Sequence, residues 1–529
     1  MRRPPPYIRP MTLDVAHSSS RQERGARLRT VRICTLLCPP LGLILLWRAR
    51  ELGLGRKILG TIFIPLYSLL YAAALIALLL RFSTLEIEWR GGFPPVLTWH
   101  KTHPDYAALE ASRRAPPKTP IALTPSAAAD WPGFRGPNRD GHYDEQPLAT
   151  NWPANGLRPL WKQPVGGGYA SFALAGGRAF TIEQRRDQEA LTAYDAASGT
   201  ELWACAYPAL FNEPLGGEGP RATPFYSDGN VYSLGALGDL LCVDAVTGRV
   251  LWKLNILADN FAELLTYGIA SSPLVIGDAL IVQAGGPRGH SVAAYHKLTG
   301  KPIWKVLDDP AAYSSPVLAE LAGRAQLLVV TANRAVGLEP SDGALLWSTP
   351  WKVNQGNRNN AQPVLLGPNC FLLSAGYGTG CRAVEISPSD TGFAARTLWE
   401  NKSLKNKFTS SVFWRGCVFG LDEDILTCLD AQTGERKWKD GHYGYGQVVL
   451  AGGYLIILSG SGELALVKAN PARFEELARF QAINGKTWNH PALAGGRIFI
   501  RNAVEMASFD LRPAPATADP VKSKPYEEK

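Results

Sequence analysis

Short apolar runs separated by tight turns dominate the chain from residue 156 to residue 511. Residues 272–282 read Ser-Pro-Leu-Val-Ile-Gly-Asp-Ala-Leu-Ile-Val, so that a Gly-Asp turn divides two apolar runs. Runs of this kind are typical of antiparallel β-strands, and they group into units of about four strands. A single such sheet cannot bury both of its faces. The pattern therefore predicts an all-β fold in which several sheets stack radially.

One motif recurs about every 40–50 residues, which indicates a repeat architecture. It reads Asp-x-x-Thr-Gly-x-x-x-Trp with variations, and its copies end at Trp203, Trp252, Trp304, Trp347, Trp399 and Trp438. The copy ending at Trp399 is degenerate. In such a turn the Asp side chain caps its own backbone and the Gly supplies a positive φ angle. The units that carry the regular motif are therefore expected to share one type of turn before their last strand.

This motif resembles that of pyrroloquinoline-quinone (PQQ) type β-propeller repeats. Such repeats occur in quinoprotein dehydrogenases and in the B lipoprotein of the outer-membrane β-barrel assembly machine. The segment Trp131-Pro-Gly-Phe-Arg-Gly-Pro-Asn-Arg-Asp-Gly141 resembles the opening of bacterial PQQ-like propeller proteins that have no assigned reaction. The resemblance covers roughly residues 131–510. It implies a propeller in which the motif Trp packs between blades.

The number of blades follows from two further units that lack the Trp, residues 447–480 and 490–511. The last unit is one strand short, and Trp161 lies in a strand-like run with no repeat before it. If this run completes the last unit, the ring closes with eight blades and leaves no free sheet edge. Seven blades with loose ends is the alternative.

The N-terminal region predicts a membrane anchor. Residues 58–80 form an uncharged run of 23 residues, long enough to cross a hydrocarbon core of about 30 Å as a transmembrane helix. A shorter apolar run, residues 33–47, is open to interpretation as a second crossing or a re-entrant segment. We expect a basic cytoplasmic N-terminus (1–32), a membrane region (33–80), a Pro/Ala-rich linker (81–155), the propeller (156–511) and a disordered tail (512–529).

The net charge of +9 originates in residues 1–57, where Lys and Arg far outnumber acidic residues. The charge therefore predicts no nucleic-acid partner, because the remainder of the chain is balanced. Basic residues beside the start of the apolar run favour the cytoplasm on that side. We expect the inner (cytoplasmic) membrane to hold the helix and the propeller to lie on the periplasmic side.

Alignment of the units places one polar residue at the start of each first strand, the strand that lines a propeller channel. These residues are Ser171, Thr223, Ser272, Ser315, Gln362, Ser410, Gln447 and His490. One interpretation is structural, with the side chains satisfying local backbone groups. The other is a polar ring at the mouth of the channel.

Larger groups lie just upstream of this ring, namely Arg221, Tyr267, Tyr313, Arg358, Asn360, Lys407, Tyr445 and Trp488. Cations beside aromatic rings suit a planar anionic ligand through charge-assisted hydrogen bonds and stacking. Such a ligand is PQQ, a carboxylated sugar or a peptide terminus. We therefore predict ligand binding at the channel mouth.

No catalytic residue can be assigned. A PQQ dehydrogenase implies a calcium ion, which prefers six to eight oxygen ligands, and the weak candidate ligands are Glu218, Asp308, Asp309, Asn354 and Asn359. None of them falls in a recognisable motif. We expect a binding or assembly scaffold for a protein, peptide or glycan. The alternative is a PQQ-dependent oxidoreductase with quinone and Ca²⁺ at the channel mouth.

Two pairs of cysteines have a spacing that would allow a cross-strand disulfide, but the sequence does not decide whether either bond forms. Cys417 and Cys428 flank a possible two-residue turn at Asp422-Glu423, and the register that follows from this turn places them opposite one another. Cys370 and Cys381 have the same spacing. A disulfide at either pair requires a location outside the cytoplasm.

Overall fold

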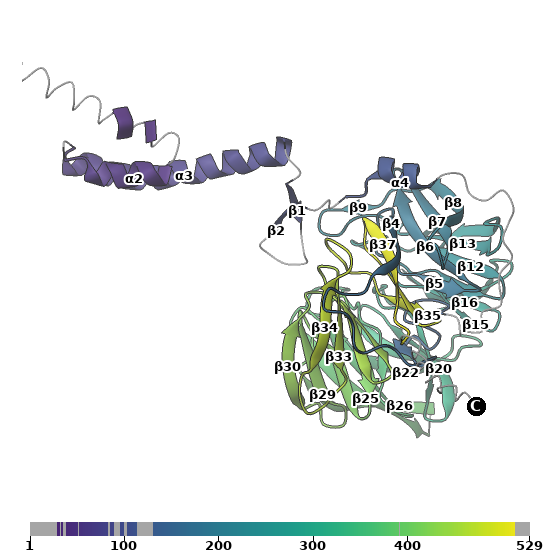
Figure 1. The fold of residues 1–529 in the computed structure, drawn as a ribbon. Helices are drawn as coiled ribbons and strands as arrows, with labels where there is room; N and C mark the ends of the chain where they lie inside the picture. The colour runs from purple at the N-terminus through teal and green to yellow at the C-terminus, as the bar shows by residue number, and fades with distance from the viewer. Residues whose placement is uncertain are drawn as a thin grey trace, which may run out of the picture. The chain divides into compact units, whose positions relative to one another are not determined.

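The computed structural model describes residues 29–31, 33–34, 39–50, 52–82, 85–88, 96–99, 103–113, 131–390 and 392–513. The chain divides into two compact units, Met1–Glu86 and Ile87–Lys529. Figure 1 shows helices in the first unit and many sheets in the second. Most of the predicted N-terminus (1–32) and of the predicted tail (512–529) lies outside the described residues.

The first unit contains α2 (Pro39–Arg48) and α3 (Leu54–Phe82). The part Leu54–Leu79 of α3 is long and apolar enough to cross a membrane, as predicted for residues 58–80. Trp47 Nε1 of α2 donates a hydrogen bond to Thr61 Oγ1 of α3 over 3.0 Å. At about 1.5 Å per residue, α2 is too short to span a bilayer by itself. The role of residues 33–47 stays a prediction.

The second unit contains the predicted eight-bladed β-propeller (Figure 1). In blades 1 to 7 four antiparallel strands follow one another along the chain, and the last blade takes its fourth strand from before the first blade. Blades 1 to 4 are β5 (Ala173–Ala175), β6 (Arg178–Arg185), β7 (Gln188–Asp195), β8 (Glu201–Pro208); β11 (Phe225–Ser227), β12 (Asn230–Leu234), β13 (Asp239–Asp244), β14 (Val250–Asn255); β15 (Leu274–Ile276), β16 (Ala279–Gly286), β17 (His290–His296), β18 (Pro302–Val306); and β19 (Val317–Leu321), β20 (Arg324–Val330), β21 (Arg334–Leu338), β22 (Leu345–Pro350).

Blades 5 to 8 continue the same order. They are β23 (Val364–Leu365), β24 (Cys370–Ala375), β25 (Gly380–Ser389), β26 (Gly392–Asn401); β27 (Val412–Trp414), β28 (Cys417–Asp422), β29 (Ile425–Asp430), β30 (Arg436–His442); β31 (Gln447–Ala451), β32 (Tyr454–Leu458), β33 (Glu463–Lys468), β34 (Glu476–Gln481); and β35 (Ala492–Ala494), β36 (Arg497–Arg501), β37 (Glu505–Asp510), β4 (Pro159–Pro164). Short elements outside the blades are β1 (Glu86–Glu88), β2 (Val96–Thr98), α4 (Tyr106–Ser112), β3 (His142–Tyr143), β9 (Asn212–Glu213), β10 (Gly217–Glu218) and α5 (Ile256–Asp259).

The ring closes through β4, which is the outer strand of the last blade. Trp161 of β4 pairs with Ser508 of β37 in an antiparallel register. This confirms the prediction that the strand of Trp161 completes the final unit and that the propeller has eight blades. Because the first and last parts of the propeller share one sheet, the circle has no free edge where it closes.

Most of the motif tryptophans pack against the motif Gly of the next blade. A Cβ atom added to Gly248 would lie 2.7 Å from Trp203 Cδ2, and one added to Gly199 would lie 2.7 Å from Trp161 Cδ2. Trp203 Nε1 also donates a hydrogen bond to Ala245 O over 3.1 Å. Two constraints select glycine at this position. Its φ is positive, and the indole ring occupies the space that a side chain would need.

Trp347 departs from this pattern because the next blade carries the degenerate copy. Its Nε1 donates to Gln326 Oε1 of its own blade over 2.6 Å. In the next blade β25 runs on to Ser389, so the tight motif turn is missing. The Trp347 ring instead lies 5.4 Å from that of Phe371, and blades 4 and 5 still share a hydrophobic contact.

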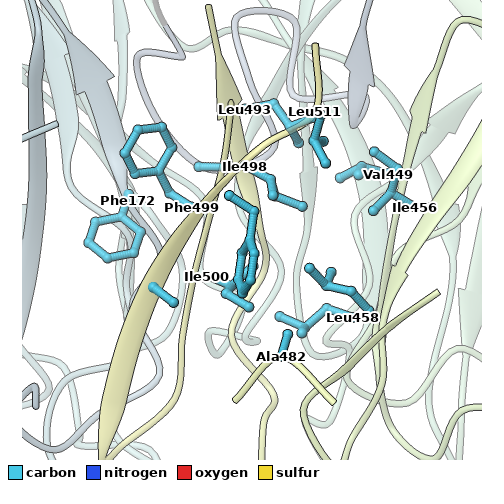
Figure 2. Packing of buried hydrophobic residues seen from close by; sticks show 14 of the residues in the cluster. Phe172, Val449, Ile456, Leu458, Ala482, Leu493, Ile498, Phe499, Ile500 and Leu511 are labelled. Carbon is cyan, nitrogen blue, oxygen red and sulfur yellow. The ribbon is translucent and has the colours of Figure 1, made fainter. Parts of the chain in front are cut away.

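Buried apolar side chains fill the space where the ring closes. Figure 2 shows Phe172 and Phe499 facing one another between blades 1 and 8, with Val449 and Ile456 of blade 7 nearby. The two phenylalanine rings lie 6.3 Å apart at an edge-to-face angle. The core is therefore continuous across the blades that the two ends of the propeller bring together.

The cysteine pairs differ from the prediction. The turn between β28 and β29 lies at Glu423-Asp424, one residue later than expected, so Cys417 pairs with Asp430 and Cys428 with Phe419. Cys381 lies opposite Ser374, not Cys370. A shift of one residue in a two-residue turn moves the register by two. All four cysteines are free thiols.

The substitution Gly248→Ala tests the contact between blades. It adds a methyl group against Trp203 at a φ of +74°, and we expect it to lower the free energy of unfolding by about 2–4 kcal/mol, because left-handed strain and overpacking add. Denaturant unfolding of the full chain in detergent measures the change. Gly229→Ala is the control, since Gly229 has a φ of +80° with open space around it. Equal losses for the two variants would contradict the packing role.

Candidate ligand-binding cavity

A half-open cavity of about 420 Å³ lies at one end of the channel, within the size range of pockets that hold small ligands. The segments that lead into the first strands of the blades form most of its wall. The predicted residues on this wall are Arg221, Tyr267, Ser272, Tyr313, Ser315, Arg358, Asn360, Lys407, Gln447, Trp488 and His490. The other predicted residues do not line it, namely Ser171, Thr223, Gln362, Ser410 and Tyr445. Ligand binding by these residues remains a prediction.

The polar ring joins the inner ends of neighbouring blades. Ser171 N donates to Thr223 Oγ1 over 3.0 Å, and Thr223 N donates to Ser272 Oγ over 2.9 Å. Gln362 N likewise donates to Ser410 Oγ over 3.0 Å. These side chains thus satisfy backbone groups across blade boundaries, whereas the structural interpretation expected them to satisfy local backbone groups. The ring holds the strand starts in place, and the residues upstream of it form most of the wall.

Several wall residues that were not predicted lie at one fixed distance in sequence from the ring residues. The position two residues before the ring residue faces the cavity in most blades, and it also holds Tyr169, Ala270 and Phe408. A constant offset applied to every repeat would have found them. The wall also contains Glu213 of β9 and four residues of other loops, Leu215, Gly216, Gln355 and Tyr377. No repeat signal points to these five residues.

One side of the cavity is cationic. The Arg358 guanidinium lies 5.3 Å from the Tyr267 ring and 5.2 Å from the Tyr377 ring. Lys407 Nζ lies 5.3 Å from the same Tyr377 ring. Two cations thus converge on one aromatic side chain, at distances where cation–π attraction is significant.

An aromatic row forms another part of the wall. The rings of Tyr169 and Trp488 stack at 5.2 Å, and Phe408 lies 4.6 Å from Trp488. Lys486 Nζ lies 4.8 Å from the Trp488 ring, and burial lowers the pKa of Lys486 to about 8. Its amine donates to Leu215 O over 3.0 Å, which ties a loop of the mouth to this row.

Arg221 and Glu213 form an ion pair of 3.2 Å within the wall. The Glu213 carboxylate also accepts hydrogen bonds from the backbone N–H groups of Leu215 and Gly216. The Arg221 guanidinium lies 4.5 Å from the Phe211 ring. This ion pair therefore stabilises the conformation of residues 213–221.

Residues 131–143, here called the channel segment, pair with the inner strands of three blades. Trp131 pairs with Leu174 of blade 1, Tyr226 N of blade 2 donates to Pro132 O, and β3 adds a parallel strand to β31 of blade 7. The prediction placed this segment in the linker of residues 81–155. The structure corrects that boundary, because the segment lies within the propeller. Its Phe134 contributes to the wall of the cavity.

Arg135 of the channel segment is buried and bonded to carbonyl groups. It donates to Ser410 O, Ser411 O and Asp140 O at 2.7–3.2 Å. Burial lowers its pKa to about 10. Its Nη1 lies 3.3 Å from His490 Nε2, so Nε2 accepts and Nδ1 carries the proton. Burial and the neighbouring Arg135 charge lower the pKa of His490 to about 3, which keeps the imidazole neutral.

Arg139 connects blades 3 and 4 in the same manner. It donates to Ser272 O over 3.2 Å, to Pro316 O over 2.9 Å and also to Pro273 O. Burial lowers its pKa to about 9. Among the described residues no carboxylate pairs with it. Backbone carbonyl dipoles therefore balance this buried charge.

The weak metal candidates do not line the cavity. Asp309 forms an ion pair with Arg334 at 2.8 Å, and Glu218 accepts a hydrogen bond from Tyr106 of α4. Asp308 accepts from Gly289 N, and the amides of Asn354 and Asn359 donate to Tyr377 O and Thr331 O, respectively. Within the described part of the chain, no group of three or more His, Cys, Asp or Glu side chains is arranged to hold a metal ion.

Comparisons with known proteins agree with this architecture. Residues 186–440 match the family described as outer membrane protein assembly factor BamB. BamB of Burkholderia pseudomallei is 23% identical over 314 residues, which cover 57% of this chain and 74% of that protein.

Solved structures resemble the fold. Quinohemoprotein alcohol dehydrogenase ADHIIG from Pseudomonas putida covers 74% of this chain and 82% of its own, with 12% identity and a TM-score of 0.52. BamB from Moraxella catarrhalis covers 68% of this chain and 99% of its own, with 15% identity and a TM-score of 0.49.

The substitution Arg139→Met tests the role of the channel segment. It leaves three carbonyl groups without their donor, and we expect it to lower the free energy of unfolding by about 3–5 kcal/mol. Arg288→Met is the control, because Arg288 is exposed and has the same φ of 56°. Denaturant titration of both variants in detergent provides the measurement. A loss below 1 kcal/mol for Arg139→Met would argue against the role.

The buried His490 predicts a pH dependence of stability. The unfolded chain binds a proton at the ordinary His pKa of 6.5, whereas the folded chain binds it only near pH 3. The contribution of His490 is therefore complete above pH 6.5 and is lost as the pH falls below it, by about 1.4 kcal/mol per pH unit. Relative to His490→Gln, the wild type should lose stability between pH 6.5 and 5. The exposed His442→Gln is the control and should keep the wild-type slope.

Proposed function

Because the chain is built from PQQ-type propeller repeats similar to those of BamB, we propose that it is a membrane-anchored binding scaffold. The propeller holds a protein, peptide or glycan at the half-open cavity. The observation that carries this proposal is a cavity that combines cations with aromatic side chains.

The anchor in this proposal is α3. Arg48, Arg50, Arg56 and Lys57 lie before or at its start, and positive residues favour the cytoplasmic side. The propeller follows the helix along the chain and is therefore assigned to the periplasmic side of the inner membrane. An assembly factor of the outer membrane, such as the Burkholderia relative by its name, works with protein partners, which favours a polypeptide as occupant.

The second candidate is a PQQ-dependent oxidoreductase. The fold of the Pseudomonas quinohemoprotein and the cations beside aromatic rings favour it, because PQQ is planar and carboxylated. The calcium ion of such enzymes fits less well. Glu213 is the carboxylate among the described wall residues, and Arg221 with two backbone N–H groups already occupies it. We therefore place the scaffold first.

Site-specific photo-crosslinking in membranes tests the scaffold. A crosslinker at Gln355 or Leu215 on the cavity wall should capture a discrete partner. The control position is Val250, which is 42% exposed on the outer strand β14 and should capture nothing comparable. Equal capture from all three positions, or none from the wall, contradicts the proposal. In parallel, PQQ and Ca²⁺ are added to the full chain, and quinone-dependent dye reduction without capture would favour the oxidoreductase.

A further inference from the structure

The cavity contains two subsites of different chemistry that lie next to each other. Arg358 and Lys407 approach one ring, that of Tyr377, within 5.3 Å. Arg358 donates to Gln355 Oε1 over 2.6 Å, and among the described residues no carboxylate forms an ion pair with it. Its guanidinium has further N–H groups, since Arg carries five donors in a planar fork. We call this part of the cavity the anionic subsite, because its cations suit an anionic group of the ligand.

The apolar subsite begins at the neighbouring residue. Phe408 follows Lys407 directly, and Lys407 Nζ lies 5.5 Å from its ring. Phe408 packs at 4.6 Å on Trp488, which stacks on Tyr169. A row of three rings thus extends from the cations. Flat aromatic surfaces of this kind favour a ring in offset or edge-to-face contact.

Charge within the cavity supports an anion. The wall carries Arg221, Arg358 and Lys407 against one carboxylate, Glu213, which is paired with Arg221. The neutral His490 adds no charge. Arg358, which has no ion pair among the described residues, therefore leaves a positive charge on the side of the wall that faces the Tyr377 ring. A carboxylate matches the planar fork of Arg358 through parallel hydrogen bonds.

We propose that the cavity recognises a carboxylate carried beside an aromatic ring, with the carboxylate at Arg358 and Lys407 and the ring against Phe408 and Trp488. The C-terminal residue of a polypeptide that ends in an aromatic side chain has this chemistry, and so does a free aromatic acid. The inference rests on the proposed function and names the chemistry of its ligand.

Calorimetric titration of the full chain in detergent tests this chemistry with three small probes. N-acetylphenylalanine carries both groups, its amide lacks the carboxylate, and N-acetylalanine lacks the ring. We expect N-acetylphenylalanine to bind at least about tenfold more tightly than either of the other two. Equal binding of the acid and the amide would overturn the anionic subsite, and equal binding of N-acetylalanine would overturn the apolar one.

Variants assign the subsites to residues. Arg358→Gln should weaken the binding of N-acetylphenylalanine about tenfold or more. Arg415→Gln is the matched control, because Arg415 lies 5.1 Å from the Trp414 ring in a similar cation–π contact but is not part of the cavity wall. It should bind like the wild type. The same loss in both variants, or no loss in Arg358→Gln, would overturn the proposal.

A hexapeptide that ends in phenylalanine, compared with its C-terminal amide, distinguishes the two sources. Binding of the acid form at least as tight as that of N-acetylphenylalanine supports a chain end, whereas exclusion of the peptide alone supports a small aromatic acid. Either result keeps the chemistry. Partner capture from Gln355 with no binding of any probe would refute this inference and leave the scaffold intact. Binding of the probes without capture of a partner would support this inference and contradict the scaffold.

Discussion

The contact between a tryptophan and the glycine turn of the next blade is the interaction on which this propeller depends. A four-stranded sheet has two apolar faces, and it becomes stable only when both are covered. Trp203 covers the turn at Gly248, and Trp161 covers the turn at Gly199. The second of these contacts joins the first blade to the last. The same local chemistry that sets the spacing of blades therefore also closes the circle.

Closure brings the starts of the first strands together around one axis. Their backbone N–H groups face neighbouring blades, and the ring side chains accept hydrogen bonds from several of them. The channel segment satisfies further groups in the same space. Arg135 and Arg139 reach carbonyl groups of blades 3, 4 and 6. Neither forms an ion pair with a carboxylate of the described residues, and the carbonyl contacts offset the cost of burying the two charges. Polar groups therefore line the interior of the channel.

The cavity is a consequence of this rigid ring. Residues just upstream of the strand starts form most of its wall. Their spacing is set by backbone that the ring hydrogen bonds hold in place. A site built on such a scaffold keeps cations and aromatic side chains in fixed positions, which lowers the entropic cost of binding a ligand.

The sequence by itself determined the all-β repeat fold, the eight blades and the shared last blade, because turn chemistry and alternation are encoded within each repeat. The common register also located most of the predicted wall residues, such as Arg221 and Trp488. Tertiary structure alone decided the rest. Tyr377 lines the cavity from a loop without a repeat signal. Arg139 donates hydrogen bonds to carbonyl groups that lie more than a hundred residues away in the sequence. Such contacts depend on the closed ring, which no single repeat encodes.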